Sequence, residues 1–276
     1  MRNYTHILYH GNCYDGFGAA LCAWLALGDG AQYIPVLYGQ APPALPPEAK
    51  VLIVDFSYPR EQLIEIHRSV DLLRVLDHHV TAQEALAGLP WATFDLSKSG
   101  AVLAYEHFFP ATAQAQPDIG LWPFVMYLQD RDLWTFELPS SREVAAALRA
   151  YPFDFRVWEA LARRRFANLA AEGEAVLRHQ DQMVKIMCEQ AVWVVLGGHS
   201  VPVVNATVFF SEVGEELCKR FPEAPFAGYY LDRADGVRQW GLRSRNGFDT
   251  SVVAKMYGGG GHAGASGFAT KVPEVL

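Results

Sequence analysis

Side chains that can bind metal ions stand at or just after the ends of four apolar segments: His10 with Asp15, Asp55, the run Asp77-His78-His79, and Asp130. In an open parallel sheet, ligands bind beyond the carboxyl ends of the strands. Three strand ends and one helix end would therefore bring these carboxylates and imidazoles to one crevice. A cluster of carboxylates is costly unless cations neutralise it. Aspartate and histidine together suit Mn²⁺, Zn²⁺ or Fe²⁺, so the pattern predicts a metal site.

Each of these residues also has an ordinary structural interpretation. Asp55 alone could cap a helix or lie in a loop. His10 could be a hydrogen-bonding histidine, and Asp130 with Asp132 could form a surface ion-pair patch. Three consecutive ligand-type residues at the end of a buried strand, Asp77 to His79, have fewer structural explanations. We therefore favour the metal interpretation for the whole group.

The elements that would position these residues alternate between short apolar runs and helical patterns. The expected strands are 5–10, 33–38, 51–56 and 72–76, and the expected helices are 16–27, 59–68, 99–109 and 119–128. The run 51–56 is apolar apart from Asp55, which is typical of a strand buried on both faces. Strands that alternate with helices indicate a parallel, doubly wound α/β sheet.

A second block follows a stretch that has no proline between Pro152 and Pro202. Apolar residues near helical spacing predict one long connecting helix or a helix pair there, with Gly173 as the candidate break. Beyond it we expect strands at 192–196, 201–207, 226–231 and 237–243, and helices at about 212–220 and 250–257. The expected domains are a catalytic α/β domain at 1–155, a helical linker at 156–190 and a smaller α/β substrate-binding domain at 191–276.

Composition excludes several classes of protein. The chain has 276 residues, 51% of them hydrophobic and 19% charged, which excludes disorder as the main state. The longest apolar run, Ala19–Leu27, is far shorter than the roughly 20 residues of a membrane span. A net charge of −7 argues against stable binding of duplex DNA. The four cysteines form no CxxC pair and residues 1–10 contain no apolar signal sequence, so we expect a reduced, cytoplasmic protein.

Five motifs, in order along nearly the whole chain, resemble those of the DHH phosphoesterase family, in particular its RecJ-like and oligoribonuclease-like members. They are the segment His10-Gly-Asn-Cys-Tyr-Asp15-Gly-Phe-Gly-Ala-Ala, the Asp55 strand, the run Asp77-His78-His79, Asp130 with Trp134 and Phe136, and the tail Gly258-Gly-Gly-Gly-His262-Ala-Gly-Ala-Ser-Gly-Phe268. The tail is similar to the signature of the DHH-associated C-terminal domain. It distinguishes this chain from family II inorganic pyrophosphatases.

The resemblance implies a phosphoesterase with two metal ions, usually Mn²⁺, with Mg²⁺, Co²⁺ or Fe²⁺ as other choices. The implied metal ligands are His10, Asp15, Asp55, His78 and Asp130, with Asp55 bridging the two ions. Asp77 would orient an imidazole, and His79 would face the substrate phosphate. Both are therefore expected to act in catalysis.

The glycine-rich tail predicts a phosphate contact in the second domain. Glycines allow backbone N–H groups to approach a phosphate closely, which nominates Gly259, Gly260 and Gly261. His262 could donate to a phosphate oxygen, and Arg243, at the end of an expected strand, could form a forked contact. The alternative for the glycines is a flexible loop.

The first motif departs from the common pattern, in which two acids have the spacing Asp-x-Asp. If Asp15 is the second acid, Cys13 stands in place of the first; if Asp15 is the first, Phe17 replaces the second. Either alignment loses one carboxylate. Cys13 could then be a thiolate ligand or an ordinary buried cysteine.

The expected substrate is a short single-stranded oligonucleotide or a small nucleotide phosphate, held between the domains. A phosphatase or exopolyphosphatase using the same site is the nearest alternative. A nucleotide-binding sensor with a weakened metal centre is the alternative outside the enzymes, because the first motif lacks an acid. Asp15, Asp55 and His78 favour the enzyme.

Overall fold

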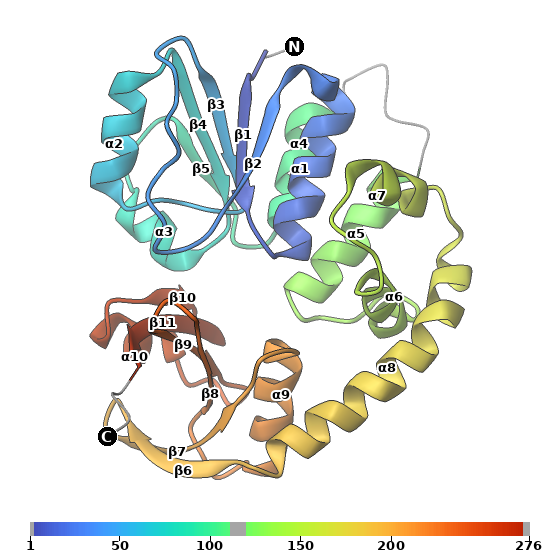
Figure 1. Cartoon of the computed structure of the whole chain (residues 1–276), viewed down its shortest axis with the longest axis vertical. Coiled ribbons are helices and arrows are strands. Elements are labelled where there is room, and N and C mark those ends of the chain that lie inside the picture. The colour runs from blue at the N-terminus through green and yellow to red at the C-terminus, as the bar shows by residue number, and fades with distance from the viewer. Residues whose placement is uncertain (1–2, 111–119, 273–276) are drawn as a thin grey trace. The chain divides into compact units, whose positions relative to one another are not determined.

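The computed structural model describes residues 3–110 and 120–272 of the chain. The chain folds into two compact units, residues 1–177 and residues 178–276. The helix α8 (Phe166–Cys188) begins in the first unit and ends in the second (Figure 1).

A five-stranded parallel sheet forms the centre of the first unit, in the order β2-β1-β3-β4-β5. The strands are β1 (His6–His10), β2 (Gln32–Val36), β3 (Lys50–Val54), β4 (Leu72–Asp77) and β5 (Ala92–Phe94). Residues Val51–Val54 of β3 are all buried, as their continuous apolar run predicts. The predicted parallel α/β sheet is confirmed.

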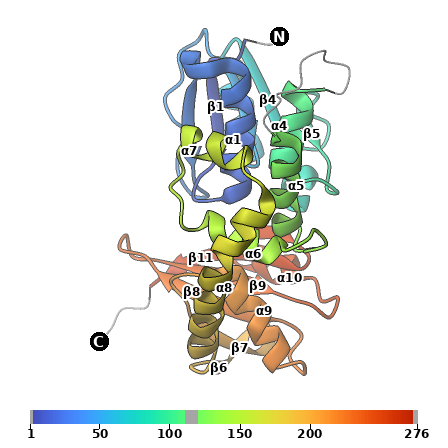
Figure 2. The same ribbon diagram turned by 90° about the vertical axis from the view of Figure 1, so that its right-hand side faces the viewer.

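Helices cover both faces of this sheet (Figures 1 and 2). Ile7, Leu52 and Val54 face a core with α1 (Tyr14–Leu27) and α4 (Gly100–Phe108). Leu8, Val51 and Ile53 point to the opposite face, in a core with α2 (Arg60–Ser69) and Leu86 at the end of α3 (Val80–Ala85). Because side chains of a strand alternate between faces, each buried strand supplies both cores.

Three further helices extend the core on the α1 side: α5 (Leu121–Asp132), α6 (Ser141–Leu148) and α7 (Phe155–Ala162). The sequence predicted α5 but not α3 or α6, which have only six and eight residues. The helix α7 begins at the edge of the stretch in which the sequence predicted one long helix or a helix pair. The expected first residue of α5, Ile119, lies outside the described residues.

The expected break at Gly173 is wrong, because α8 continues through it from Phe166 to Cys188. A Cβ atom at Gly173 would lie 1.8 Å from the carbonyl oxygen of Glu143 and 3.0 Å from the amide nitrogen of Ala147. Glycine here permits close packing of α8 on α6, and it does not interrupt the helix.

A six-stranded mixed sheet forms the second unit, in the order β10-β11-β9-β8-β7-β6. Its strands are β6 (Val192–Leu196), β7 (His199–Asn205), β8 (Ala227–Asp232), β9 (Val237–Arg243), β10 (Gly260–His262) and β11 (Ala265–Lys271). The helices α9 (Phe210–Arg220) and α10 (Thr250–Met256) accompany it. The sequence did not predict β10 and β11, because glycine is depleted in strands.

Within the described residues, no helix has both the length and the apolar character needed to cross a lipid bilayer.

The close approach of α8 to α6 predicts that Gly173→Ala destabilises the first unit by about 1–3 kcal/mol, the usual cost of overpacking. Alanine favours a helix by about 1 kcal/mol over glycine, but here its methyl group would meet backbone atoms. Urea unfolding measures the change. Gly30→Ala is the control, because no atom lies within 4 Å of a Cβ at that position. A Gly173→Ala variant as stable as the wild type would contradict this packing.

Candidate metal centre

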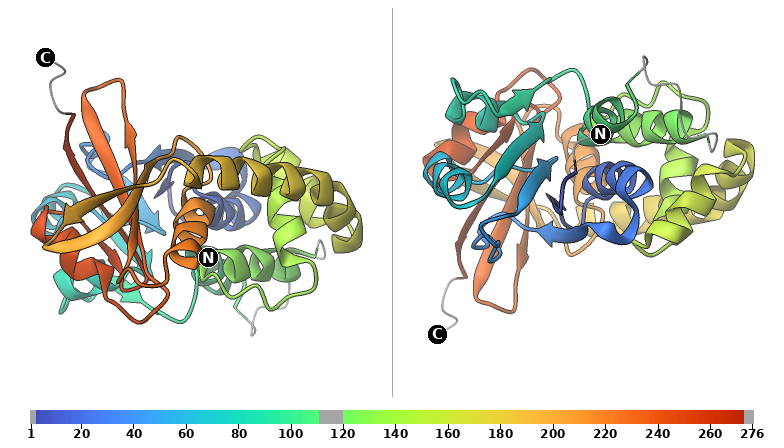
Figure 3. Two further views of the ribbon diagram at one scale, coloured as in Figure 1. Left: turned by 90° about the horizontal axis from the view of Figure 1, so that it is seen from below. Right: turned by 90° about the horizontal axis from the view of Figure 1, so that it is seen from above.

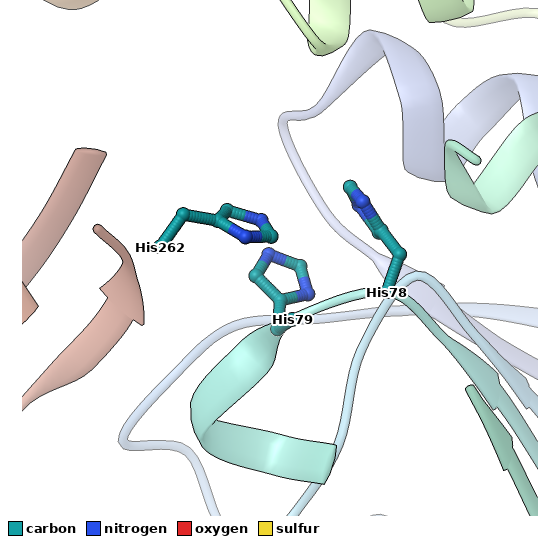
Figure 4. A group of neighbouring side chains, drawn as sticks. All are labelled: His78, His79 and His262. Carbon is teal, nitrogen blue, oxygen red and sulfur yellow. The ribbon is translucent and has the colours of Figure 1, made fainter. Parts of the chain in front are cut away.

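The carboxyl ends of β1, β3 and β4 bring the expected ligands together. His10 is the last residue of β1, Asp55 follows β3, and Asp77 ends β4 immediately before His78 and His79. The strands are parallel neighbours, so these ends meet at one edge of the sheet. Figure 4 shows the imidazoles of His78 and His79 extending from the end of β4; the third residue that it labels belongs to the second unit.

Asp55 lies at the middle of this cluster and is almost completely buried. Its Oδ1 atom is 3.0 Å from Nε2 of His78. Its Oδ2 atom is 3.6 Å from Nδ1 of His10 and accepts a hydrogen bond from the thiol of Cys13 at 3.5 Å. The two oxygens of one carboxylate therefore face two different groups of potential ligands.

The backbone of Asp55 is in the left-handed region, with φ of 56°. This conformation is costly for most residues other than glycine and concentrates at functional sites. The Asp55 amide donates to the carbonyl of Leu76 in β4 at 3.0 Å, which fixes the residue in place. The turn after β3 is thus held in a strained form that directs Asp55 into the cluster.

Asp15, His78 and Asp132 form the second group, with ligand atoms within 4.8 Å of one another. Nε2 of His78 is 3.9 Å from Oδ2 of Asp15 and 3.6 Å from Oδ2 of Asp132. Asp15 also accepts hydrogen bonds from the amides of Gly100 and Ala101 at the start of α4, at 2.5 and 3.0 Å. Helix N-termini favour negative charge, so α4 helps to hold the Asp15 carboxylate.

Burial and mutual repulsion raise the pKa values of two of the three central carboxyls. Burial and the charges of Asp55 and Asp132 raise the pKa of Asp15 well above its usual range, and burial raises the pKa of Asp132, with Asp55 adding to the shift. Burial opposes the charge of Asp55, but the neighbouring imidazoles of His10 and His78 outweigh it and lower the Asp55 pKa. The cluster has more carboxylates than its imidazoles can neutralise. A divalent cation would offset this excess negative charge and stabilise the carboxylates in their ionised form.

Asp77 makes hydrogen bonds with both of its oxygens. Oδ2 accepts from the hydroxyl of Ser57 at 2.7 Å. Oδ1 accepts from the amide of His78 at 2.7 Å and from Nδ1 of His79 at 2.6 Å. Burial would lower the pKa of His79, but the adjacent Asp77 carboxylate raises it overall. Asp77 therefore fixes the ring of His79 and favours its protonated form.

Asp130 does not lie with the other expected ligands. Its Oδ1 atom accepts hydrogen bonds from Thr135 at 2.6 Å and the amide of Glu137 at 2.8 Å, and its Oδ2 atom accepts from the amide of Leu138 at 3.1 Å. It organises the loop that follows α5. The expectation of Asp130 as a metal ligand is corrected: Asp132 is the carboxylate of this segment that lies beside His78.

Asp130 and Asp132 lie two residues apart at the end of α5. Residues two apart on a helix point in nearly opposite directions, so only one of the pair can face the cluster. The sequence contained both residues but gave no signal for choosing between them.

Tyr38 is a site residue that the sequence analysis missed. Its ring centre is 5.2 Å from that of His10, 4.7 Å from that of Phe56 and 6.2 Å from that of His79. The residue is nevertheless 51% exposed. The ring of a half-exposed tyrosine thus stands beside the ligand cluster.

A tight turn presents Tyr38. The amide of Gln40 donates to the carbonyl of Leu37 at 3.1 Å, and the amide of Leu37 donates to the side chain of Gln40 at 3.2 Å. Gly39, with φ of 86°, takes the left-handed position that such a turn requires. No pattern in the sequence connected this turn with the cluster.

The phosphate contacts expected in the second unit are only partly compatible with its structure. Ala265 of β11 pairs with both His262 and Arg243, so these two residues occupy the same face of the sheet, one strand on either side. Gly260 and Gly261 lie in β10, which pairs with β11. The amide of Gly259 already donates to the carbonyl of Ala254 at 2.9 Å, so the expectation that Gly259 donates to phosphate is corrected.

Glycine at position 259 has a packing reason instead. A Cβ atom there would lie 2.1 Å from the carbonyl oxygen of Gly267 and 2.5 Å from Cβ of Phe268. Part of the glycine-rich motif is therefore required by close contact between the end of α10 and β11.

The different surroundings of Asp132 and Asp130 predict opposite effects of substitution. If a metal ion binds beside His78, Asp132→Asn should weaken Mn²⁺ binding about tenfold or more, because even indirect partners of metal ligands contribute that much. Asp130→Asn should leave Mn²⁺ affinity unchanged but destabilise the loop by about 1–3 kcal/mol, because an amide nitrogen cannot accept the lost hydrogen bonds. Mn²⁺ titration calorimetry and melting curves in chelator separate the two. The reverse pattern would restore Asp130 as the ligand.

Comparison with known proteins supports the fold. No protein-family model matches the chain. An uncharacterised protein of Acanthamoeba polyphaga mimivirus is 32% identical over an alignment of 289 positions, which includes 95% of this chain. The chain spans 66% of the length of that relative.

Two solved structures share the architecture at low sequence identity. An exopolyphosphatase-related protein from Bacteroides fragilis superposes with a TM-score of 0.57 at 12% identity, covering 99% of this chain and 88% of that one. The DHH domain of a protein described as a member of a ribosomal-protein family superposes with a TM-score of 0.56 at 14% identity, covering 98% of this chain and 83% of that one. The chain therefore has the fold of the DHH phosphoesterase family, as its five motifs predict.

Proposed function

We propose that this chain is a metal-dependent phosphoesterase that uses two Mn²⁺ ions to hydrolyse phosphoester bonds of short oligonucleotides or small nucleotides. The observation that carries the proposal is the position of Asp55, whose two oxygens face separate groups of ligand atoms. A carboxylate placed in this way can bridge two metal ions.

The residues present suit two such ions. His10, Cys13 and Asp55 form one group, and Asp15, His78 and Asp132 form the other, with Asp55 adjoining both. Carboxylate and imidazole donors suit Mn²⁺. Burial and neighbouring carboxylates raise the pKa values of Asp15 and Asp132, and bound cations would offset this repulsion. Two bound metal ions would lower the pKa of a water molecule and stabilise the charge that develops on phosphate oxygens.

His79 and Asp77 are proposed to handle protons and orient the substrate. Asp77 holds the ring through Nδ1 and favours its protonated form, so the ring can donate from Nε2 to a phosphate oxygen. General acids placed in this way typically contribute about 10²–10⁴-fold to rate.

Tyr38 favours a substrate that carries a base. Its partly open ring stands beside the ligand cluster, and aromatic rings in this position stack on nucleobases without strong sequence preference. Inorganic polyphosphate has no flat group that could use such a ring. This is the reason for preferring nucleotide substrates to polyphosphate.

The second unit is proposed to contribute phosphate contacts through Arg243 and His262, which share a sheet face. The acidic chain is proposed to act on single-stranded or small substrates and not on duplex DNA. All four cysteines lie within the described residues and are free thiols, which suits the proposed cytoplasmic location.

The bridging position of Asp55 predicts that Asp55→Asn lowers turnover of a dinucleotide at least about 10³-fold, since electrostatic stabilisation by a single group can supply that much. Asparagine tolerates the left-handed backbone, so the fold should be retained. Bound Mn²⁺, measured by elemental analysis after gel filtration, should fall together with turnover.

Asp95→Asn is the matched control, because Asp95 is a solvent-accessible aspartate that accepts hydrogen bonds from Ser97. It should retain full turnover and metal content. Near-normal turnover of Asp55→Asn would overturn the two-metal proposal. Wild-type protein that binds no transition metal would favour a nucleotide-binding sensor instead.

The exposed ring of Tyr38 predicts a selective effect on substrates with bases. Tyr38→Ala should raise KM for a dinucleotide about 10-fold, because one base–aromatic stack contributes about 1–3 kcal/mol. Tyr38→Phe should keep KM close to the wild-type value. Neither variant should change KM for any residual polyphosphate hydrolysis.

Steady-state kinetics with both substrates provide this test. Equal losses for dinucleotide and polyphosphate would show that Tyr38 supports the structure of the site rather than the base. Faster wild-type cleavage of polyphosphate than of dinucleotide would make the exopolyphosphatase alternative the better description.

A further inference from the structure

The strand β6 forms one edge of the sheet in the second unit (Figure 1). In the view from below, β6 and β7 lie in front of the other strands of their sheet (Figure 3). The sequence of β6, Val192-Trp-Val-Val-Leu196, contains no charge and no proline. Edge strands present unpaired backbone groups, and natural proteins usually protect them with charges, proline, or very short length.

The other three sheet edges of the described residues carry such protection. β2 contains Pro35, and β5 and β10 have three residues each. β6 is thus the one edge among these four that has five apolar residues and no protective device. A strand of this kind is suited to pairing with another strand.

Pro202 determines which backbone groups of β6 are open. Trp193 is opposite Pro202 in the antiparallel β6–β7 pair. Proline has no N–H, so this cannot be a pair that exchanges two hydrogen bonds. The pairs alternate along the strands, so Val192, Val194 and Leu196 bond to β7, while the N–H and C=O groups of Trp193 and Val195 point to the open edge.

The side chains of Trp193 and Val195 are also exposed. They share one face of the strand, and the residues are 48% and 76% exposed respectively. The edge therefore has open hydrogen-bonding groups and open apolar surface at the same two positions.

We propose that β6 pairs antiparallel with β6 of a second copy of this chain, around a twofold axis at Val194. Trp193 of each copy would then lie opposite Val195 of the other, and both residues direct their backbone groups outward. Each such pair can exchange two hydrogen bonds, so the two pairs close a continuous sheet across the axis.

Alternative registers of the same strand fit less well. An axis at Trp193 would require the amide of Ala191, which already donates to the carbonyl of Cys188 at 3.3 Å. An axis at Val195 would require the amide of Gly197, which donates to the hydroxyl of Tyr257 at 3.2 Å. The axis at Val194 uses only backbone groups that face the open edge.

The side chains also match in this register. Each Trp193 would contact a Val195 of the other copy on the same face, and aromatic rings pair favourably with β-branched residues across strands. The absence of charge in Val192–Leu196 means that two identical strands meet without repulsion. A charged partner would find no complementary group on this strand, so a second copy is the occupant that the strand fits best.

Sedimentation velocity on the full chain, from about 1 to about 200 µM, tests the proposal over the affinity range of small interfaces. We expect a concentration-dependent dimer in the wild type. Val195→Lys should be monomeric at every concentration, because a lysine would then lie opposite Trp193 of the other copy in both cross-strand pairs. Val208→Lys, which changes a valine that is 48% exposed outside β6, is the control and should dimerise like the wild type.

Hydrogen exchange adds a readout that is specific to the register. The amides of Trp193 and Val195 should become protected as concentration rises, and the same amides should exchange rapidly in Val195→Lys. Circular dichroism confirms that the variants are folded. A wild-type monomer at about 200 µM, or a Val195→Lys dimer, would overturn the proposal.

Discussion

Repulsion among three carboxylates is the constraint on which the candidate centre depends. Asp15, Asp55 and Asp132 all lie within reach of a single imidazole, that of His78. Burial tends to lower the pKa of His78, but its hydrogen bond to the Asp55 carboxylate and the charges of Asp132, Asp55 and Asp15 raise it to about 10. The protonated ring offsets only part of the negative charge. The surrounding elements must therefore hold these groups together against their mutual repulsion.

Glycines make that confinement possible. A Cβ at Gly100 would lie 2.4 Å from Cβ of Asp55 and 2.9 Å from Oδ2 of Asp15, so α4 can present its N-terminal amides only because the side chain is absent. A Cβ at Gly16 would lie 2.3 Å from the carbonyl oxygen of His10. The close contacts of α1 and α4 with the strand ends are thus part of the site.

The sequence predicted what depends on local pattern. The buried strand β3 followed from a continuous apolar run, and its end placed Asp55 correctly beside His78. The choice between Asp130 and Asp132 was not predictable, because it depends on how α5 is rotated against the sheet. The turn at Tyr38 and the packing of Gly173 depend on contacts between distant segments, which no single-sequence pattern records.

The same charge constraint gives a physical account of Cys13, which stands in place of an acid in one of the two alignments with the family motif. Burial and the neighbouring Asp55 carboxylate raise the pKa of the Cys13 thiol well above its usual value, so it is neutral without metal. A fourth carboxylate here would add to the repulsion, whereas a neutral thiol donates a hydrogen bond to Asp55. A thiol must lose its proton before it can bind a metal ion, so binding at this position would be coupled to proton release. Cys13 therefore eases the assembly of the metal-free fold and leaves a ligand atom available at the same place.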